Sequence, residues 1–198
     1  MSLIKLKNNA LDNLTSFEGS ASLGDMVFIS SATASASSSI EFTLGDYKEY
    51  KFFFVNMHPS VDGAYFTFNT SIDSGSNYNV TKTTTFFNAA HSESDSTSFG
   101  YVTSDDLSQS TAFQILGRVI GADNDQNLSG YLQLFNPSSS VYVKHFISRV
   151  ADCTTGDFIG DRFIAGYFND GANDINAVKF QMSSGNIDDG IIKMYGVS

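Results

Sequence analysis

The chain ends in two apolar runs that set the expectation for its whole fold. They read Ile-Asn-Ala-Val-Lys-Phe-Gln-Met at 175–182 and Gly-Ile-Ile-Lys-Met-Tyr-Gly-Val at 190–197. In an extended chain, Val178, Phe180 and Met182 point to one side, and the lysine and glutamine between them point to the other. That period of two is typical of a half-buried strand. Because the turn-forming segment 183–189 joins the two runs, we predict a hairpin that closes the domain at its C-terminus.

Similar short runs, separated by turn signals, recur upstream. We expect strands at 26–31, 40–44, 48–57, 64–72, 78–87, 99–103, 112–117, 131–135, 141–150 and 162–169. The run Phe-Phe-Phe-Val at 52–55 does not alternate, which predicts a central strand buried on both faces. The polar segments 89–98 and 152–161 are expected to be loops. The pattern predicts an all-β fold, an antiparallel β-sandwich of jelly-roll-like type.

Composition and length agree with a single β domain. The 198 residues include 18 Phe and 9 Tyr but no Trp and only 2 Pro, and aromatic residues favour half-buried pleated surfaces. We place the β-sandwich domain at 25–198. Residues 1–24 carry apolar side chains at helix-like spacing, and we expect either a loosely ordered terminus or an N-terminal arm that attaches to another subunit.

The charge balance argues against some partners. Lys and Arg number 11 against 21 Asp and Glu, a net charge of −10, so we expect no nucleic-acid partner, because that affinity comes largely from Lys and Arg. No apolar run is long enough to span a membrane, and lysines stand where a signal peptide has its apolar core, so we expect no membrane insertion. Cys153 is the single cysteine, and no neighbouring basic group would activate its thiol.

Two features point to contacts beyond a simple core. Residues 32–39 lack any large side chain, which favours an edge strand or a strand lying close to another backbone. Tyrosine is more abundant than a core needs, and its flat ring and polar hydroxyl suit sugars, subunit interfaces or cross-strand pairs. The tyrosines are Tyr47, Tyr50, Tyr65, Tyr78, Tyr101, Tyr131, Tyr142, Tyr167 and Tyr195.

The short motifs favour structural roles. Residues 71–78 resemble an Asp-box, Ser-x-Asp-x-Gly-x-Thr-Trp, with Asn and Tyr in the last two places. We interpret them as a turn in which Asp73 caps backbone amides and Gly75 takes a positive φ. Sialidase-type enzymes repeat this box and add an arginine cluster, and the sequence has neither feature.

Metal and catalytic candidates are weak. Asp123, Asp125 and Asn127 are spaced like calcium ligands, but the glycine and glutamate of an EF-hand loop are missing, so a solvated turn is the main interpretation. The three histidines lack metal-ligand spacing, and His145, inside a predicted strand, is interpreted as structural. No nucleophile elbow, phosphate-binding loop or zinc-protease motif occurs, so we expect no catalytic residue, no cofactor and no enzymatic activity.

Several segments carry a resemblance to a known family: 185–197, the opener 4–6 with 10–11, and 74–80, 135–139, 143–146 and 165–169. These segments resemble virion proteins of marine tailed phages, including cyanophages. The resemblance implies a jelly-roll-like fold, oligomeric assembly and a place on the particle. It transfers no functional residue, because these motifs are structural.

The expected function is therefore that of a phage virion structural protein, a tail fibre or spike component that contacts the host surface. The alternatives are a capsid decoration protein on the head, and a free carbohydrate-binding module or sugar-cleaving enzyme. We expect a homotrimer, assembled in the host cytoplasm, that joins other virion proteins through residues 1–24. A host cell-surface glycan is the expected external partner.

Overall fold

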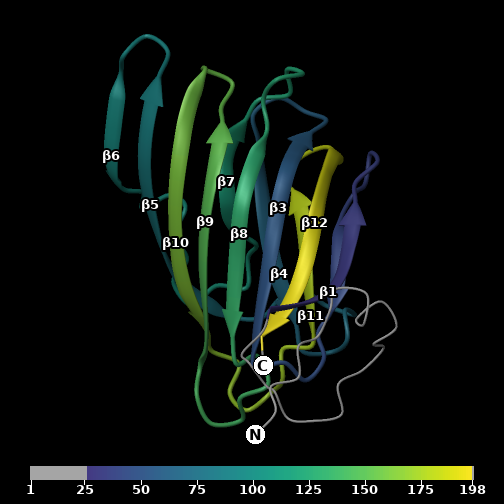
Figure 1. Cartoon of the computed structure of the whole chain (residues 1–198). Coiled ribbons are helices and arrows are strands. Elements are labelled where there is room, and N and C mark those ends of the chain that lie inside the picture. The colour runs from purple at the N-terminus through teal and green to yellow at the C-terminus, as the bar shows by residue number, and fades with distance from the viewer. Residues whose placement is uncertain (1–25, 198) are drawn as a thin grey trace, which may run out of the picture.

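The computed structural model describes residues 26–197, which form two antiparallel sheets packed face to face (Figure 1). The strands are β1 (Met26–Thr33), β2 (Ile40–Thr43), β3 (Glu49–Pro59), β4 (Ala64–Ser71), β5 (Lys82–Ser92), β6 (Thr97–Tyr101), β7 (Gln114–Ile120), β8 (Leu128–Phe135), β9 (Lys144–Cys153), β10 (Phe158–Phe168), β11 (Ala177–Met182) and β12 (Ile187–Val197). The predicted all-β antiparallel β-sandwich is confirmed. The jelly-roll-like topology stays a prediction, and the predicted arm at 1–24 lies outside the described residues.

The two sheets differ in width. The large sheet has the strand order β1-β12-β3-β8-β9-β10-β5-β6, and the small sheet has the order β2-β11-β4-β7. In Figure 1 the small sheet lies behind the centre of the large one, while β5 and β6 extend to one side. One face of the large sheet therefore packs on the small sheet, and no strand among residues 26–197 covers its other face.

Phenylalanine rings fill the space between the sheets. The ring of Phe180 on β11 lies 5.3 Å from that of Phe52 and 5.2 Å from that of Phe54, both on β3. Phe66 on β4 stacks on Phe180 at 5.9 Å. All four rings are buried. Burying such a side chain stabilises a fold by roughly 1.5–3 kcal/mol, so this cluster dominates the core.

The two C-terminal runs are strands, but the predicted hairpin between them is wrong. β11 pairs with β2 and β4 in the small sheet, whereas β12 pairs with β1 and β3 in the large one. The link between them crosses the edge of the sandwich, where the backbone N–H of Ser183 donates to the carbonyl of Tyr65. The predicted alternation is confirmed, because Val178, Phe180 and Met182 are all buried. Alternation identifies the buried face of a strand and not its partner.

The run at 52–55 is central in the sheet but is not buried on both faces. Phe52 and Phe54 face the core, while Phe53 is half-buried and Val55 is exposed on the opposite face. β3 lies between β12 and β8, as expected of a central strand. The prediction of burial on both faces is wrong because, within residues 26–197, a second sheet packs against only one face of this sheet.

Two predicted loops are largely strand. Segment 89–98 contains the end of β5 and the start of β6, and segment 152–161 contains the turn between β9 and β10. As a charged residue, Asp152 favoured the loop prediction, but in the structure it is fully buried. Arg162 donates to it from Nε at 2.9 Å and from Nη2 at 2.7 Å, so the charge is paired inside the sandwich. Burial raises the pKa of Asp152, and Arg162 opposes that rise.

The Asp-box-like segment forms the predicted turn. The backbone N–H of Asn77 donates to Asp73 Oδ1 at 2.8 Å, and the Ser71 hydroxyl donates to the same oxygen at 2.6 Å. These bonds lower the pKa of Asp73 to about 2. Gly75 has a φ of 89°, and a Cβ there would lie 2.9 Å from the hydroxyl of Tyr78. The turn thus requires glycine for both its conformation and its contact with the aromatic ring.

The small-residue run at 32–39 lies at an edge and close to another backbone. Its first residues end β1, the outermost strand of the large sheet on that side. The backbone N–H of Ala34 then donates to the carbonyl of Gly190 at 2.8 Å, and that of Ala36 to the carbonyl of Asp188 at 2.9 Å. The close backbone contact is therefore made within this chain, to the first residues of β12.

Candidate binding surface

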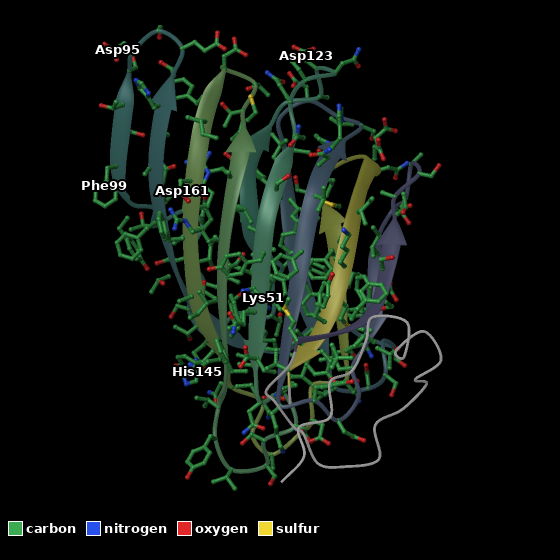
Figure 2. The ribbon with its side chains drawn as sticks, in the orientation of Figure 1. Lys51, Asp95, Phe99, Asp123, His145 and Asp161 are labelled. Carbon is green, nitrogen blue, oxygen red and sulfur yellow. The ribbon has the colours of Figure 1, made fainter. Side chains whose placement is uncertain are left out.

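The candidate site lies on the face of the large sheet that the small sheet does not cover; we call it the outer face. Its strand register places seven outward side chains in one row across seven strands. From β12 to β6 the row is Lys193, Phe53, Tyr131, Arg149, Phe163, Phe87 and Tyr101. Five of these seven residues are aromatic, and the other two are cationic. Figure 2 looks onto this face, with Lys51, His145 and Asp161 spread over the sheet and Phe99 at its β6 margin.

One end of the row is a cation–aromatic cluster on β12, β3 and β8. Lys51 Nζ lies 4.5 Å from the ring centroid of Tyr131 and 5.3 Å from that of Phe53. Tyr195 packs edge-on against Phe53 at 5.6 Å. Phe28 of β1 extends the cluster by packing against Tyr195 at 5.5 Å. Lys51 makes no ion pair within residues 26–197, and its ammonium contacts the faces of these two rings instead.

The other end of the row lies on β9, β10, β5 and β6. Arg149 forms a two-pronged ion pair with Asp161, at 3.0 Å from Nε and 2.7 Å from Nη2. This pair raises the pKa of Arg149 and holds its guanidinium 4.5 Å above the ring of Phe163. Phe87 and Tyr101 then pack edge-to-face at 5.1 Å. Phe163, Phe87 and Tyr101 remain 38%, 41% and 44% exposed, so these rings stand in solvent although they contact one another.

Small residues hollow the surface beside the row. Ala165 on β10 and Thr85 on β5 separate two shallow depressions of about 340 and 420 Å³. Phe163 and Tyr131 flank the first depression, and His145 and Tyr167 flank the second, with their rings 6.4 Å apart. The outer face is therefore a ridged platform of rings with hydrogen-bonding groups at its margins, as expected for a ligand with both apolar and polar surfaces.

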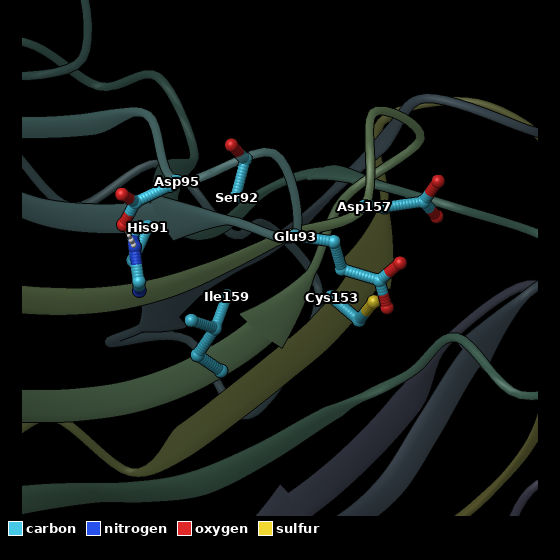
Figure 3. A pocket seen from close by; sticks show the side chains of 7 residues that line it. All are labelled: His91, Ser92, Glu93, Asp95, Cys153, Asp157 and Ile159. Atoms are coloured by element: carbon cyan, nitrogen blue, oxygen red, sulfur yellow. Dashed lines mark hydrogen bonds and ion pairs between the residues drawn. The ribbon is translucent and has the colours of Figure 1, made fainter.

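A separate hollow of about 460 Å³ lies at one end of the sandwich, between the β5–β6 and β9–β10 turns (Figure 3). It gathers chemically active groups, but their arrangement does not favour catalysis. His91 Nε2 is bonded to the exposed carboxylate of Asp95 at 3.1 Å. Burial, and then the carboxylates of Asp157 and Asp125, raise the pKa of the Cys153 thiol, which keeps it in its unreactive protonated form.

The candidate metal ligands lie in the exposed turn between β7 and β8. Figure 2 shows Asp123 at the same end of the molecule as Asp95. Asp123 and Asp125 are exposed, and Asn127 accepts a hydrogen bond from the backbone N–H of Cys153 through its own carbonyl. No group of three or more His, Cys, Asp or Glu side chains within residues 26–197 is placed to hold a metal ion. The interpretation of Asp123, Asp125 and Asn127 as a solvated turn stays a prediction.

The histidines and tyrosines fall in different environments. His145, which we interpret as structural, lies in β9 as expected and is exposed on the outer face, where its ring packs against that of Tyr167. His58 lies on β3, with its Nδ1 3.0 Å from the carbonyl of Pro59. Tyr50 is buried, with its hydroxyl accepting the backbone N–H of Gly45, whereas other tyrosines lie on the outer face: Tyr101, Tyr131, Tyr167 and Tyr195. Sequence reasoning found the tyrosine surplus but missed Phe163, Phe87 and Arg149, which enter the row only through register.

Residues 26–197 contain no helix long and apolar enough to cross a membrane. A scan against protein-family models and searches of curated proteins and of solved structures found no match to this chain. Its function is therefore inferred from its own residues.

Proposed function

We propose that this chain is a structural protein of a bacteriophage particle, a tail fibre or spike subunit whose β-sandwich contacts the host surface. The observation that carries the proposal is the outer face, where a row of aromatic and cationic side chains crosses a wide sheet that no second sheet formed by residues 26–197 covers. Large exposed apolar patches mark interaction sites in proteins. The resemblance of several segments to marine phage virion proteins adds the particle as the setting.

A binding role also accounts for the titratable groups better than a catalytic role does. Hydrolysis needs a positioned nucleophile and base, or a pair of carboxylates across a cleft. The hollow shown in Figure 3 instead places a protonated thiol beside carboxylates and pairs its histidine with an exposed aspartate. On the outer face, Asp161 is held by Arg149, and Glu49 accepts a hydrogen bond from Gln133. These carboxylates are bonded to neighbours and are not placed opposite each other.

The particle assignment is tested by analysing purified virions of the encoding phage. We expect mass spectrometry to detect the chain in the particles, and immunogold labelling to place it on the tail. Labelling on the head would replace the fibre assignment with capsid decoration. Absence of the chain from intact particles would contradict the proposal.

Assembly as a homotrimer is part of this proposal. Apolar side chains remain exposed at sites away from the row: Phe99 on β6 is 81% exposed, and Val141 and Tyr142 in the β8–β9 connection are 78% and 72% exposed. Closed symmetry is the usual arrangement for identical chains, and obligate interfaces are rich in apolar and aromatic groups. We expect light scattering on the full chain to give three times the mass of one chain. The mass of a single chain across micromolar concentrations would refute the trimer.

A free carbohydrate-binding module is the second candidate, since the exposed rings of the outer face would serve it equally well. Two observations together would favour this second candidate: absence from the particle, and glycan binding by a monomer.

A further inference from the structure

We propose that the outer-face row is a binding site for an acidic polysaccharide, a glycan chain carrying carboxylates, which runs across the strands from β3 towards β6. The inference deepens the proposed function by naming the ligand class of the same face, and it rests on that function. The geometry of the row, the charge around it and the arrangement of its polar groups support it separately.

The row has the length and periodicity of an extended glycan. Neighbouring strands in a sheet are spaced by about 4.8 Å, so the six strands from β3 to β6 extend over roughly 24 Å, enough for about five sugar rings. Phe53, Tyr131, Phe163, Phe87 and Tyr101 occupy successive strands along this path, interrupted once by Arg149. Aromatic faces pack on the apolar C–H side of a pyranose ring, so a ladder of rings at strand spacing fits a repeating sugar.

The charge around the row differs from that of the chain as a whole. Lys51, Lys193 and Arg149 balance Glu49, Asp161 and Asp106, the last of which accepts a hydrogen bond from the Tyr101 hydroxyl, whereas the whole chain carries −10. Asp161 already pairs with Arg149. Lys51 and Lys193 have no carboxylate partner within residues 26–197. Two unpaired ammonium groups beside aromatic rings favour an anionic ligand, which this acidic protein would otherwise repel.

The same charges argue against a second protein chain as the occupant. Charged residues are depleted from the buried centres of protein interfaces. Here Lys51 and Arg149 stand among the rings, and Gln133 and Thr85 lie in the adjoining cross-strand row. Such groups would be costly to bury in a dry interface, but they can hydrogen-bond to sugar hydroxyls and carboxylates at a wet one.

The test measures binding of the full-length protein to polygalacturonate, a polymer of carboxylated sugars, and to its methyl-esterified form, which keeps the rings but lacks the charge. Two outer-face variants are used, Lys51→Met and Phe163→Ala. Methionine retains an apolar stem over the rings and removes only the ammonium. The matched controls are Lys48→Met and Tyr65→Ala, which remove an exposed lysine outside the row and a half-buried tyrosine of the small sheet. Unchanged unfolding curves confirm that each variant is folded.

We expect Phe163→Ala to weaken binding of both polymers by about tenfold, because a stacked ring contributes on that scale. Lys51→Met should weaken polygalacturonate binding by roughly fivefold at low salt and leave the esterified polymer unaffected. Both controls should bind like the wild type. Absence of polygalacturonate binding, or equal losses in the control variants, would overturn the inference. It would also be overturned if light scattering showed an assembly that Phe163→Ala dissociates, because a second copy would then cover the face.

The result separates this inference from the proposed function. A chain found in the particle that does not bind polygalacturonate would leave the virion role in place and remove the acidic glycan. A chain that binds polygalacturonate but is absent from particles would keep the site and remove the virion role.

Discussion

The two faces of the large sheet carry similar side chains in opposite environments. On β3, Phe52 and Phe54 face the small sheet and are almost fully buried, while Phe53 between them faces outward. On β10, Ile164 is buried and Phe163 is 38% exposed. The difference is not in the residues but in what lies opposite them, because the four strands of the small sheet cover only one face. The inner face therefore stabilises the fold, while no strand among residues 26–197 covers the outer face, which we propose as the binding surface.

The largest expected difference between the faces is in packing. We predict that Phe180→Ala, at the centre of the inner cluster, lowers the free energy of unfolding by about 3–5 kcal/mol, since it leaves a cavity among buried rings. Phe163→Ala on the outer face should lower it by less than about 1 kcal/mol. Urea unfolding followed by tyrosine fluorescence measures both. Equal losses for the two variants would mean that the outer face is covered in the folded state.

The buried ion pair and the exposed ion pair should likewise differ in how much each stabilises the fold. Asp152→Ala leaves the guanidinium of Arg162 buried without its partner, and we expect a loss of about 3 kcal/mol in unfolding free energy. Asp161→Ala breaks the exposed pair with Arg149, and it should leave the urea midpoint almost unchanged. A loss for Asp161→Ala as large as that for Asp152→Ala would contradict the division.

A buried lysine, Lys82, and an outer-face lysine, Lys51, should affect the pH dependence of stability differently. Lys82 is fully buried, its ammonium meets only the carbonyl of Ala112 at 2.6 Å, and burial lowers its pKa to about 7. Between pH 7 and the unfolded value near 10.5, the unfolded chain holds a proton that the folded chain does not. Stability should therefore rise with pH across this window, by about 4–5 kcal/mol at about 1.4 kcal/mol per pKa unit, and the full penalty should persist below pH 7.

The variant Lys82→Met isolates this contribution. We expect the unfolding free energy of Lys82→Met to change less between pH 7 and pH 10 than that of the wild type. The unfolding free energy of Lys51→Met, on the outer face, should change with pH as that of the wild type does. If the wild type and Lys82→Met show the same pH dependence, the buried lysine is not the source.

Sequence patterns predicted which segments are strands better than they predicted which strands pair with each other. The periodicity of 175–182 and 190–197 correctly identified two strands with one buried face each, but a short connecting segment predicted a hairpin where the chain crosses between sheets. Consecutive strands do form hairpins elsewhere in the large sheet, at β5–β6, β8–β9 and β9–β10, and the pairing of 131–135 with 141–150 agrees with their sequence pattern. Local pattern cannot separate these cases, because the partner of a strand is set by contacts with distant segments.

Buried charge and the outer-face row escaped prediction for the same reason. Asp152 resembled a loop residue because its partner, Arg162, is visible only once β9 and β10 pair. In the row, Phe87 and Tyr131 come from strands separated by β9 and β10, so no window of sequence contains the site. The tyrosine surplus did indicate a surface role, which the positions of Tyr131 and Tyr195 support.

Phe163→Ala, which we expect to change stability little, should have a large effect on binding to the host surface. The most direct test is competition, in which the purified protein is added to host cells before the encoding phage, and the rate of particle adsorption is measured. We predict that the wild-type protein slows adsorption, and that the Phe163→Ala protein, although folded, does not. Equal inhibition by both proteins, or none by the wild type, would contradict the claim that the outer face contacts the host.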